Sequence, residues 1–268
     1  IKTLAVIGEN ANLIHSNGGG SAEIKALYEV TPLLGIKSRL GGQTEVKYAK
    51  GYSSDKSKKE ELIREAVELA KTSDAVIIIG GLKHIDDELQ LENNALSVSK
   101  DEEIKRYVDS EGYDKTDLDL PYDQDELIKQ VLEVNEDAVV VMLSGAPIKM
   151  TEWIDEARAV VQTWYNGMEG GNALAEALFG DINPSGKLPV TFPRVLEDCP
   201  AHKLGEFPGG KTVKYTEGIY VGYRYFETFE VEPLFYFGHG LSYTNFKYED
   251  LDISVKEAAG DVDIIVKF

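Results

Sequence analysis

The sequence predicts an α/β fold: a mostly parallel sheet covered by helices as an α/β sandwich, followed by the first strands of a β-sandwich domain. Short runs of continuous apolar residues, such as Thr3–Ile7, are typical of strands that are buried on both faces of a parallel sheet. Amphipathic helical segments alternate with these runs, which is the order of a doubly wound layer fold. Beyond Lys187 the pattern changes to a stretch rich in Gly, Pro, Tyr and Phe.

Strands and helices alternate through the first part of the chain. The expected strands, in chain order, are Thr3–Ile7, the weaker Thr44–Ala49, Ala75–Ile79, Ala138–Leu143 and Ala159–Trp164. The expected helices are Ser57–Thr72, Asp123–Glu136, a short one near Thr151–Glu156, and Asn172–Phe179. Because strands joined by helices pair in parallel through right-handed crossovers, we expect the last three strands to be neighbours in one sheet.

The tail of the chain has a different character. From Lys187 to Phe246 there is no helical periodicity, and then Leu251–Lys256 and Val262–Phe268 alternate like two strands around Ala258–Asp261. Two strands alone cannot bury a core. We therefore expect the chain to stop inside a β domain.

Charge and composition exclude several classes of function. The 268 residues include 47 Asp and Glu against 28 Lys and Arg, a formal net charge of −19, which disfavours nucleic acid and anionic membranes as partners. No apolar run approaches the ~20 residues of a membrane span, and Ile1–Gly8 is predicted to be a core strand rather than part of a signal peptide. The single cysteine, Cys199, excludes internal disulfides and thiolate metal clusters.

Several motifs that would indicate a cofactor are incomplete. Gly180–Lys187 (GDINPSGK) resembles a phosphate loop, but it has one residue too many between its glycines, and Leu188 replaces the Ser or Thr that would meet magnesium. The glycines Gly18–Gly20 lack the third glycine of a dinucleotide loop. The histidines form no metal-ligand spacing: His15, His84, His202 and His239. No cofactor and no metal are therefore expected, and a nucleotide-binding domain is disfavoured.

Four stretches together resemble a known family. They are LAVIGENANLIHSNGGGSAEI (Leu4–Ile24), VDSEGYDKTDLDLPYDQDELI (Val108–Ile128), NGMEGGNALAEALFGDINPSGKLPVTFP (Asn166–Pro193) and Glu217–Tyr248 with its FGHGLSY motif. In this order and spacing they are similar to the second, α/β-sandwich domain of the family 3 glycoside hydrolases, the β-glucosidase and β-xylosidase group. The resemblance implies an α/β-sandwich domain at 1–246 and the start of a fibronectin type III-like domain at 247–268.

The resemblance also implies a mechanism and a set of partners. Enzymes of this family are retaining, exo-acting β-glycosidases that release terminal β-linked sugars. Their aspartate nucleophile lies in a separate (β/α)8 barrel domain, which this sequence does not contain. Their acid/base glutamate comes from a loop of the sandwich domain, which corresponds to Gly81–Pro121 here. The implied partners are an oligosaccharide or β-glycoside substrate and the barrel domain, and polysaccharide breakdown suggests a periplasmic or secreted location.

Glu111 is the candidate acid/base. The family pattern, an acidic residue, any residue, then Glu-Gly-x-Asp-Arg, matches Asp109-Ser110-Glu111-Gly112-Tyr113-Asp114-Lys115, with Lys115 in place of the arginine. A carboxylic acid with a raised pKa can protonate the leaving oxygen of a glycoside. Asp109 is the alternative acid. The inserted segment Asp86–Tyr107 departs from the simpler family pattern and could carry this loop away from the barrel.

Ser21 is the candidate substrate-binding residue. It follows the glycines of Asn17–Gly20, and in the family a serine of this loop reaches the sugar subsite. Glycines let the backbone and a short side chain approach a ligand closely. Trp153 and Trp164 could stack on sugar rings, but both lie in apolar segments and are expected to pack in the core.

A second interpretation of the whole chain stays open. The inserted segment and the missing barrel favour a non-catalytic carbohydrate-binding or structural module on the same scaffold, whereas Glu111 and Ser21 favour an enzyme domain. A barrel encoded by the same polypeptide would decide between them. Specificity in the family lies largely in barrel residues, so the sequence does not name the sugar.

Overall fold

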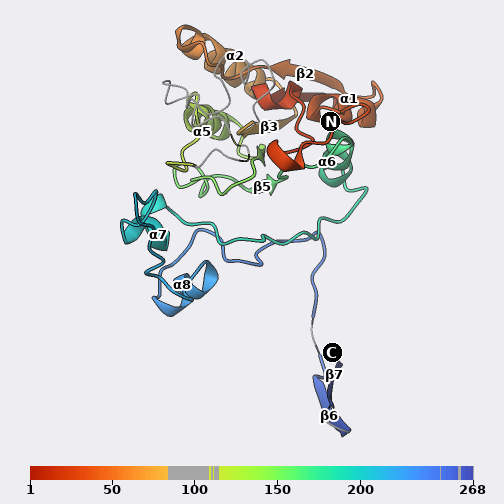
Figure 1. Cartoon of the computed structure of the whole chain (residues 1–268). Coiled ribbons are helices and arrows are strands. Elements are labelled where there is room, and N and C mark those ends of the chain that lie inside the picture. The colour runs from red at the N-terminus through yellow and green to blue at the C-terminus, as the bar shows by residue number, and fades with distance from the viewer. Residues whose placement is uncertain (84–108, 110, 112–114, 248, 259–260, 268) are drawn as a thin grey trace.

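The computed structural model of the chain describes residues 1–83, 109, 111, 115–247, 249–258 and 261–267 (Figure 1). His84 and the inserted segment Asp86–Tyr107 lie outside the described residues. Among the helices that are described, none is long and apolar enough to cross a membrane.

A parallel sheet forms the centre of the molecule. Its strands are β1 (Thr3–Ile7), β2 (Glu45–Ala49), β3 (Ala75–Gly81), β4 (Val139–Leu143) and β5 (Ala159–Gln162). They lie in the order β2-β1-β3-β4-β5, and every neighbouring pair is parallel. The register aligns Ile78 with Ile7 on one side and with Val140 on the other. The predicted sheet, including the adjacency of β3, β4 and β5, is confirmed.

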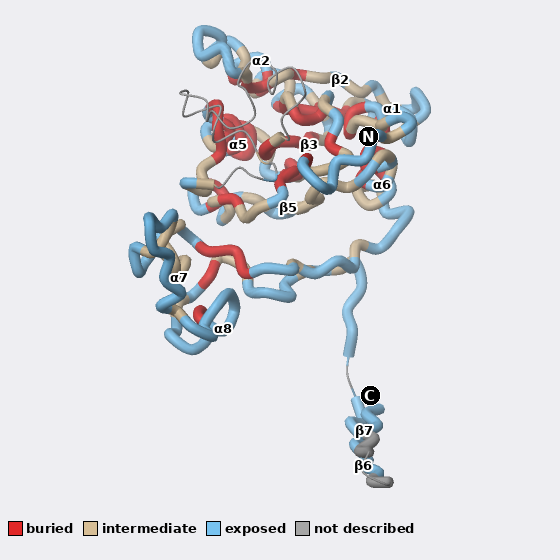
Figure 2. The backbone as a smooth tube through the Cα atoms, in the orientation of Figure 1, coloured by how far each residue is buried: buried red, intermediate tan, exposed pale blue. Residues whose placement is uncertain are grey.

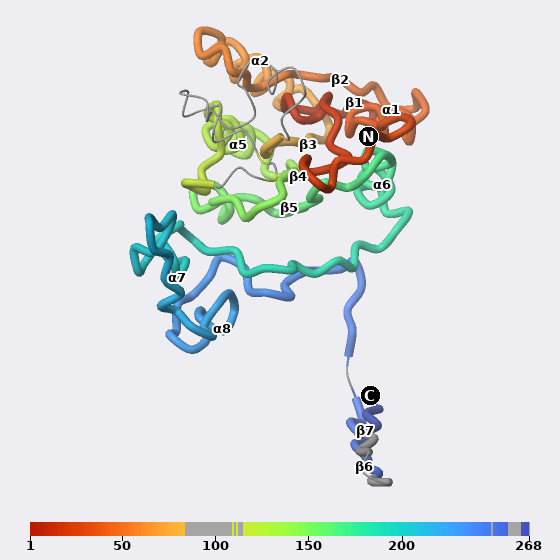
Figure 3. Tube along the Cα trace, viewed as in Figure 1, coloured from red at the N-terminus to blue at the C-terminus, as the bar shows by residue number. Residues whose placement is uncertain are grey.

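Helices cover both faces of this sheet, as Figures 1 and 3 show. Helices α2 (Lys59–Lys71) and α5 (Gln124–Val134) pack on one face, and α1 (Pro32–Leu40) and α6 (Gly170–Leu178) on the other. Successive residues of a strand point to opposite faces: Ile78 packs under α2 and α5, whereas Ile77 and Ile79 pack under α1 and α6. Burial on both faces explains the continuous apolar runs, and Figure 2 shows this buried centre in red.

Within residues 1–180, three segments differ from the prediction. Helix α1 was not expected, although Thr31 caps it by accepting a hydrogen bond from the Leu34 N–H (3.2 Å) and Gly41 ends it at φ 57°. The segment near Thr151–Glu156 forms consecutive turns rather than a helix. Strand β5 ends two residues before Trp164, because Trp164 has a left-handed backbone (φ 58°) that cannot continue a strand.

The tail extends away from the sheet and is largely exposed (Figure 2). It contains the short helices α7 (Pro200–Lys203) and α8 (Tyr223–Thr228), which the sequence did not predict, and a bridge between Phe192 and Phe235. At its end β6 (Asp252–Ala258) and β7 (Asp261–Lys267) form an antiparallel hairpin, so the two predicted strands are present. A domain boundary at residue 246 stays a prediction.

Candidate functional site

The candidate site lies at the carboxyl edge of the sheet. The loop after β1 carries Ser21, and the loop after β3 carries Asp109 and Glu111. In the strand order β2-β1-β3-β4-β5, the chain first adds β2 on one side of β1 and then adds β3, β4 and β5 on the other side. The topological switch point therefore lies between β1 and β3. In open α/β sheets, ligands bind outside the carboxyl ends of the strands at such a switch point. The topology alone therefore brings Ser21 and Glu111 to a place where a ligand can bind.

Glu111 and Ser21 are in direct contact. The carboxylate oxygen Oε2 of Glu111 accepts hydrogen bonds from the hydroxyl of Ser21 (2.6 Å) and from the Ser21 backbone N–H. The backbone N–H of Glu111 donates to the carbonyl of Gly18 (3.2 Å). Both side chains remain exposed. The two residues that the sequence singled out on separate loops, 90 positions apart, are thus joined in one site.

Gly20 makes this contact possible. Its backbone is left-handed (φ 59°), a conformation that favours glycine. A Cβ atom at this position would lie 2.2 Å from Oε2 of Glu111 and 2.4 Å from its Cβ. Any side chain at position 20 would therefore push the Glu111 carboxylate off Ser21.

Asp109 has different surroundings from Glu111. Its carboxylate Oδ2 accepts hydrogen bonds from the backbone N–H of Gly145 and from the hydroxyl of Tyr165 (3.1 Å). Its own N–H donates to the carbonyl of Lys83 (2.8 Å). Asp109 is thus tied to the loops after β4 and β5, whereas Glu111 faces the loop after β1.

The sequence analysis did not identify Gly145 and Tyr165, nor the contact of the buried His15 with Tyr165. The His15 ring stacks on that of Tyr165, with centroids 6.4 Å apart and planes 18° apart. Burial lowers the pKa of His15 to about 4, so the ring is neutral at ordinary pH. Its Nε2 lies 3.2 Å from the carbonyl of Asn10, whereas Nδ1 has no partner among the described residues.

Two buried amides hold the end of β3, from which the Glu111 loop starts. The Gln124 side chain accepts from the Gly81 N–H (2.8 Å) and donates to the Gly81 carbonyl (2.9 Å). The Asn10 amide donates to the Leu82 carbonyl (2.8 Å). These bonds satisfy backbone groups where the ladder ends, as buried polar groups require. The starting point of the loop is thereby fixed by side chains from α5 and from the segment after β1.

The pKa of Glu111 is lowered in this chain. The hydrogen bonds from the Ser21 hydroxyl and from the Ser21 N–H both favour the ionised carboxylate. A general acid needs a raised pKa, which the sequence argument expected. At neutral pH the Glu111 carboxyl group of this structure is therefore ionised, which is the form that accepts a proton rather than the form that donates one.

Ser21→Ala should raise the pKa of Glu111 toward its ordinary value, because the hydroxyl contributes most to the shift and the N–H remains. The titration of the Glu111 carboxyl carbon, followed by NMR and assigned with Glu111→Gln, measures this. Ser16→Ala is the matched control, since the Ser16 hydroxyl accepts from Asn17 in the same loop. An unchanged pKa in Ser21→Ala, or an equal rise in both variants, would contradict the contact.

The tryptophans lie in the core, as expected. Trp153 is fully buried, and its indole N–H donates to Asp125 (2.7 Å). Desolvation raises the pKa of Asp125 to about 6 despite this bond. Trp164 is partly buried against the same core and meets Phe192 edge to face. Both indoles are thus used in packing rather than presented to a sugar.

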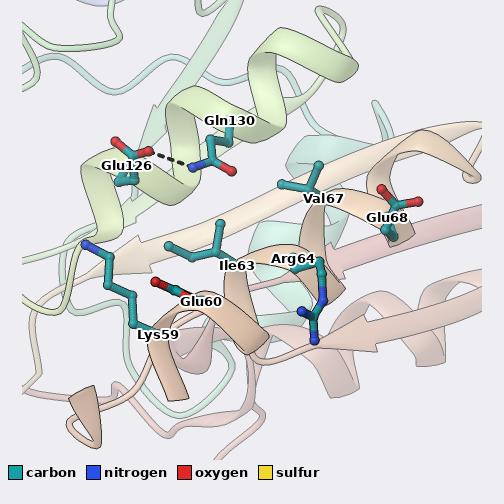
Figure 4. A pocket seen from close by; sticks show the side chains of 8 residues that line it. All are labelled: Lys59, Glu60, Ile63, Arg64, Val67, Glu68, Glu126 and Gln130. Carbon is teal, nitrogen blue, oxygen red and sulfur yellow. Dashed lines mark hydrogen bonds between the residues drawn. The ribbon is translucent and has the colours of Figure 1, made fainter. Parts of the chain in front are cut away.

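An open groove of about 400 Å³ lies elsewhere, between α2 and α5 (Figure 4). Ile63 and Val67 line it together with side chains of both charges, and none of its residues belongs to the Glu111 site. Within the described part of the chain, no group of three or more His, Cys, Asp or Glu side chains is placed to hold a metal ion.

Comparisons with known proteins identify the family. Residues 1–223 match the sequence model of the glycosyl hydrolase family 3 C-terminal domain. The chain is 39% identical to a β-glucosidase of Bacteroides ovatus, over 99% of the chain and 35% of that protein. It is 37% identical to thermostable β-glucosidase B of Acetivibrio thermocellus, over 99% of the chain and 32% of that protein.

A solved structure agrees. The crystal structure of a family 3 β-glucosidase from Bifidobacterium adolescentis superposes with a TM-score of 0.76 at 32% identity, over 98% of this chain and 35% of that one. This chain thus spans about a third of the length of these relatives. The chain belongs to glycosyl hydrolase family 3, as a C-terminal domain of the kind found in its β-glucosidases.

Proposed function

We propose that this chain supplies the general acid/base, Glu111, to a retaining, exo-acting β-glucosidase-like enzyme that hydrolyses terminal β-linked sugars. The observation that carries the proposal is an exposed carboxylate at the switch point of the sheet, held by Ser21 on the neighbouring loop. The aspartate nucleophile would lie in a (β/α)8 barrel domain outside this chain. The relatives are about three times as long as the matched region, which leaves room for such a domain.

The arrangement suits proton transfer to a leaving group. Both hydrogen bonds from Ser21 go to Oε2 of Glu111, and none of the described residues bonds to Oε1. In a retaining mechanism the acid donates its proton to the departing glycosidic oxygen as the nucleophile attacks the sugar. The same group then takes a proton from the water that hydrolyses the glycosyl-enzyme. Oε1, to which none of the described residues is bonded, is the oxygen of Glu111 that we propose exchanges this proton.

The complete site would raise the pKa of Glu111 from its lowered value in this chain. Retaining enzymes hold their two carboxyl groups about 5–5.5 Å apart, so the charge of the nucleophile disfavours a second ionised carboxylate. Covering the exposed Glu111 with the partner domain adds desolvation, which acts in the same direction. The acid form is therefore expected when the partner is in place.

Ser21 is proposed as a substrate-binding residue. Its hydroxyl is exposed and donates to Glu111 in the absence of a sugar. A sugar hydroxyl placed beside Glu111 would lie within reach of the same group. In that position Ser21 would hold the sugar and release Glu111 from one of the bonds that keep it ionised.

The exposed tail provides a surface for the proposed partner domain. It carries many large apolar side chains in contact with solvent, more than a self-sufficient surface usually presents. Those that are at least half exposed in residues 205–246 are Val213, Tyr215, Ile219, Val221, Phe229, Tyr236, Phe237, Leu241, Tyr243 and Phe246. Packing against the barrel domain would remove this surface from water.

The isolated 268 residues should not hydrolyse glycosides, because a retaining mechanism needs a second carboxylate. The test compares this chain with the full-length protein on an aryl β-glucoside and an aryl β-xyloside. The full-length protein should turn over at least one of them with retention of the anomeric configuration, measured by NMR. Turnover by the repurified isolated chain would contradict the two-domain mechanism. A full-length protein that binds sugars without turnover would favour the non-catalytic module.

A further inference from the structure

We propose that Asp109 and Tyr165 form a clamp that positions Glu111, so that both are positioning residues of the enzyme and neither is its acid. The inference rests on the function proposed for Glu111 and adds a role for residues that do not touch the reacting atoms. The clamp is defined as the Asp109 carboxylate with its two donors, the Tyr165 hydroxyl and the Gly145 N–H.

The clamp ties the Glu111 loop to the sheet at its carboxyl edge. Tyr165 follows β5, and Gly145 follows β4. The N–H of Asp109 completes the attachment by donating to the Lys83 carbonyl, just beyond β3 (2.8 Å). One residue thus bonds to groups that follow three adjacent strands, of which β3 and β4 are buried along nearly their whole length. The position of Asp109 is thereby tied to the central sheet.

Glu111 depends on this attachment because it has few contacts of its own. Only Ser110 separates the two acidic residues. Among the described residues, Glu111 is hydrogen-bonded to Gly18 and Ser21 alone, both on the loop after β1. When the Ser21 hydroxyl turns to a sugar, one of these contacts is lost. The clamp is then what holds the carboxylate over the ligand.

The surroundings of Tyr165 keep its hydroxyl group protonated, so that it remains a hydrogen-bond donor to Asp109. Its ring packs between His15, on which it stacks, and the glycines Gly18 and Gly145, where a Cβ atom would come within 3.3 Å and 3.1 Å of the ring. Burial and the neighbouring Asp109 charge raise the pKa of the Tyr165 hydroxyl far above its usual range, so it keeps its proton. A permanent donor to an ionised carboxylate gives a strong and lasting bond.

The same contacts argue against Asp109 as the acid. Its Oδ2 atom already accepts from two donors, and protonation of the carboxyl would weaken both bonds. Its side chain is directed to the loops after β4 and β5, on the far side of β3 from Ser21. Asp109 is therefore placed to hold the loop, and Glu111 to face the ligand.

The test is Tyr165→Phe in the full-length enzyme, which removes one hydroxyl and keeps the stacked ring. Misplacing a catalytic group by about 1 Å can cost 10²-fold. We therefore expect kcat/KM to fall about 10- to 100-fold for an alkyl glucoside, whose leaving group needs the acid. The fall should be less than about threefold for a dinitrophenyl glucoside, which departs without a proton. A purely structural defect would slow both substrates equally.

Tyr28→Phe is the matched control. It also removes a tyrosine hydroxyl that donates to a carboxylate, that of Glu169, and neither of these residues is hydrogen-bonded to Glu111 or Asp109 among the described residues. It should leave the ratio of the two kcat/KM values unchanged. An equal fall for both substrates in Tyr165→Phe, or no fall, would overturn the clamp.

Asp109 variants provide a second measurement that does not depend on Tyr165→Phe folding. Asp109→Asn keeps an oxygen that can accept from the Gly145 N–H, so it should recover much of the loss seen in Asp109→Ala. Because the two residues share one bond, Tyr165→Phe added to Asp109→Ala should cause little further loss. Equal losses of kcat/KM in Asp109→Asn and Asp109→Ala, or additive losses in the double variant, would contradict the clamp. Glu111→Ala, measured in parallel, separates the clamp from the proposed role of Glu111. If Glu111→Ala slows the alkyl glucoside much more than the dinitrophenyl glucoside and Tyr165→Phe does not, only the clamp is wrong.

Discussion

Glu111→Ala in the full-length enzyme should slow the hydrolysis of alkyl and oligosaccharide glucosides by about 10²- to 10⁴-fold, the usual contribution of a positioned general acid. A dinitrophenyl glucoside should still form the glycosyl-enzyme at nearly the normal rate, because its leaving group needs no proton. The intermediate should then accumulate, since no base activates water. A burst of dinitrophenol followed by a slow steady state is the expected observation.

Azide tests the second half of this prediction. It attacks the glycosyl-enzyme without a base, so it should restore turnover in Glu111→Ala and give a β-glucosyl azide. Asp109→Ala is the comparison, because it keeps the Glu111 carboxylate as a base, although less firmly held, so azide should restore its turnover far less than that of Glu111→Ala. If azide restores Asp109→Ala and not Glu111→Ala, the acid/base is Asp109. If it restores neither, the acid lies outside this pair.

Ile78→Asp should destabilise the domain by several kcal/mol, because it places an unpaired charge in the centre of the sheet. Ile78 is 1% exposed, pairs with Ile7 and Val140, and packs under α2 and α5. Buried carboxylates avoid ionisation in such places, so the loss should also grow as the pH rises. Urea unfolding at pH 5 and pH 8 measures both effects.

Two further variants calibrate the Ile78 measurement. Ile24→Asp introduces the same side chain at a position that is 78% exposed, and should change the free energy of unfolding by less than about 0.5 kcal/mol. Ile78→Val removes one methylene and should cost about 0.5–1.5 kcal/mol. If Ile78→Asp unfolds at the same urea concentration as the parent, Ile78 does not lie in a core strand.

The sheet was predictable because its strands are buried on both faces. In β3 and β4 every residue meets a helix or a neighbouring strand, so the sequence is apolar throughout and the segment is easy to recognise. Helix α1 lacks such a pattern: Lys37, Ser38 and Arg39 follow its apolar start, and only its ends, Thr31-Pro32 and Gly41, mark it. The segment near Trp153 was expected to be helical but forms turns, and the buried indole of Trp153 holds these turns by donating to Asp125.

The site was only partly predictable. Glu111 and Ser21 came from the family resemblance, and their hydrogen bond depends on the order of β1 and β3, which periodicity does not encode. Tyr165 and Gly145 carry no motif of their own. They meet Asp109 because β4 and β5 end at the same edge of the sheet, across 56 and 36 residues of sequence. The lowered pKa of Glu111 also follows from contact rather than composition.

The pairing of His15 with Tyr165 has a consequence for the pH–rate profile of the enzyme. Burial keeps His15 neutral down to about pH 4, and burial with the Asp109 charge keeps the Tyr165 hydroxyl protonated well into the alkaline range. Neither ring therefore changes charge at the pH values where a glycosidase is assayed. On the proposed mechanism, the alkaline limb of kcat/KM then needs no correction for these two neighbours, and its midpoint gives the pKa of Glu111 in the assembled enzyme.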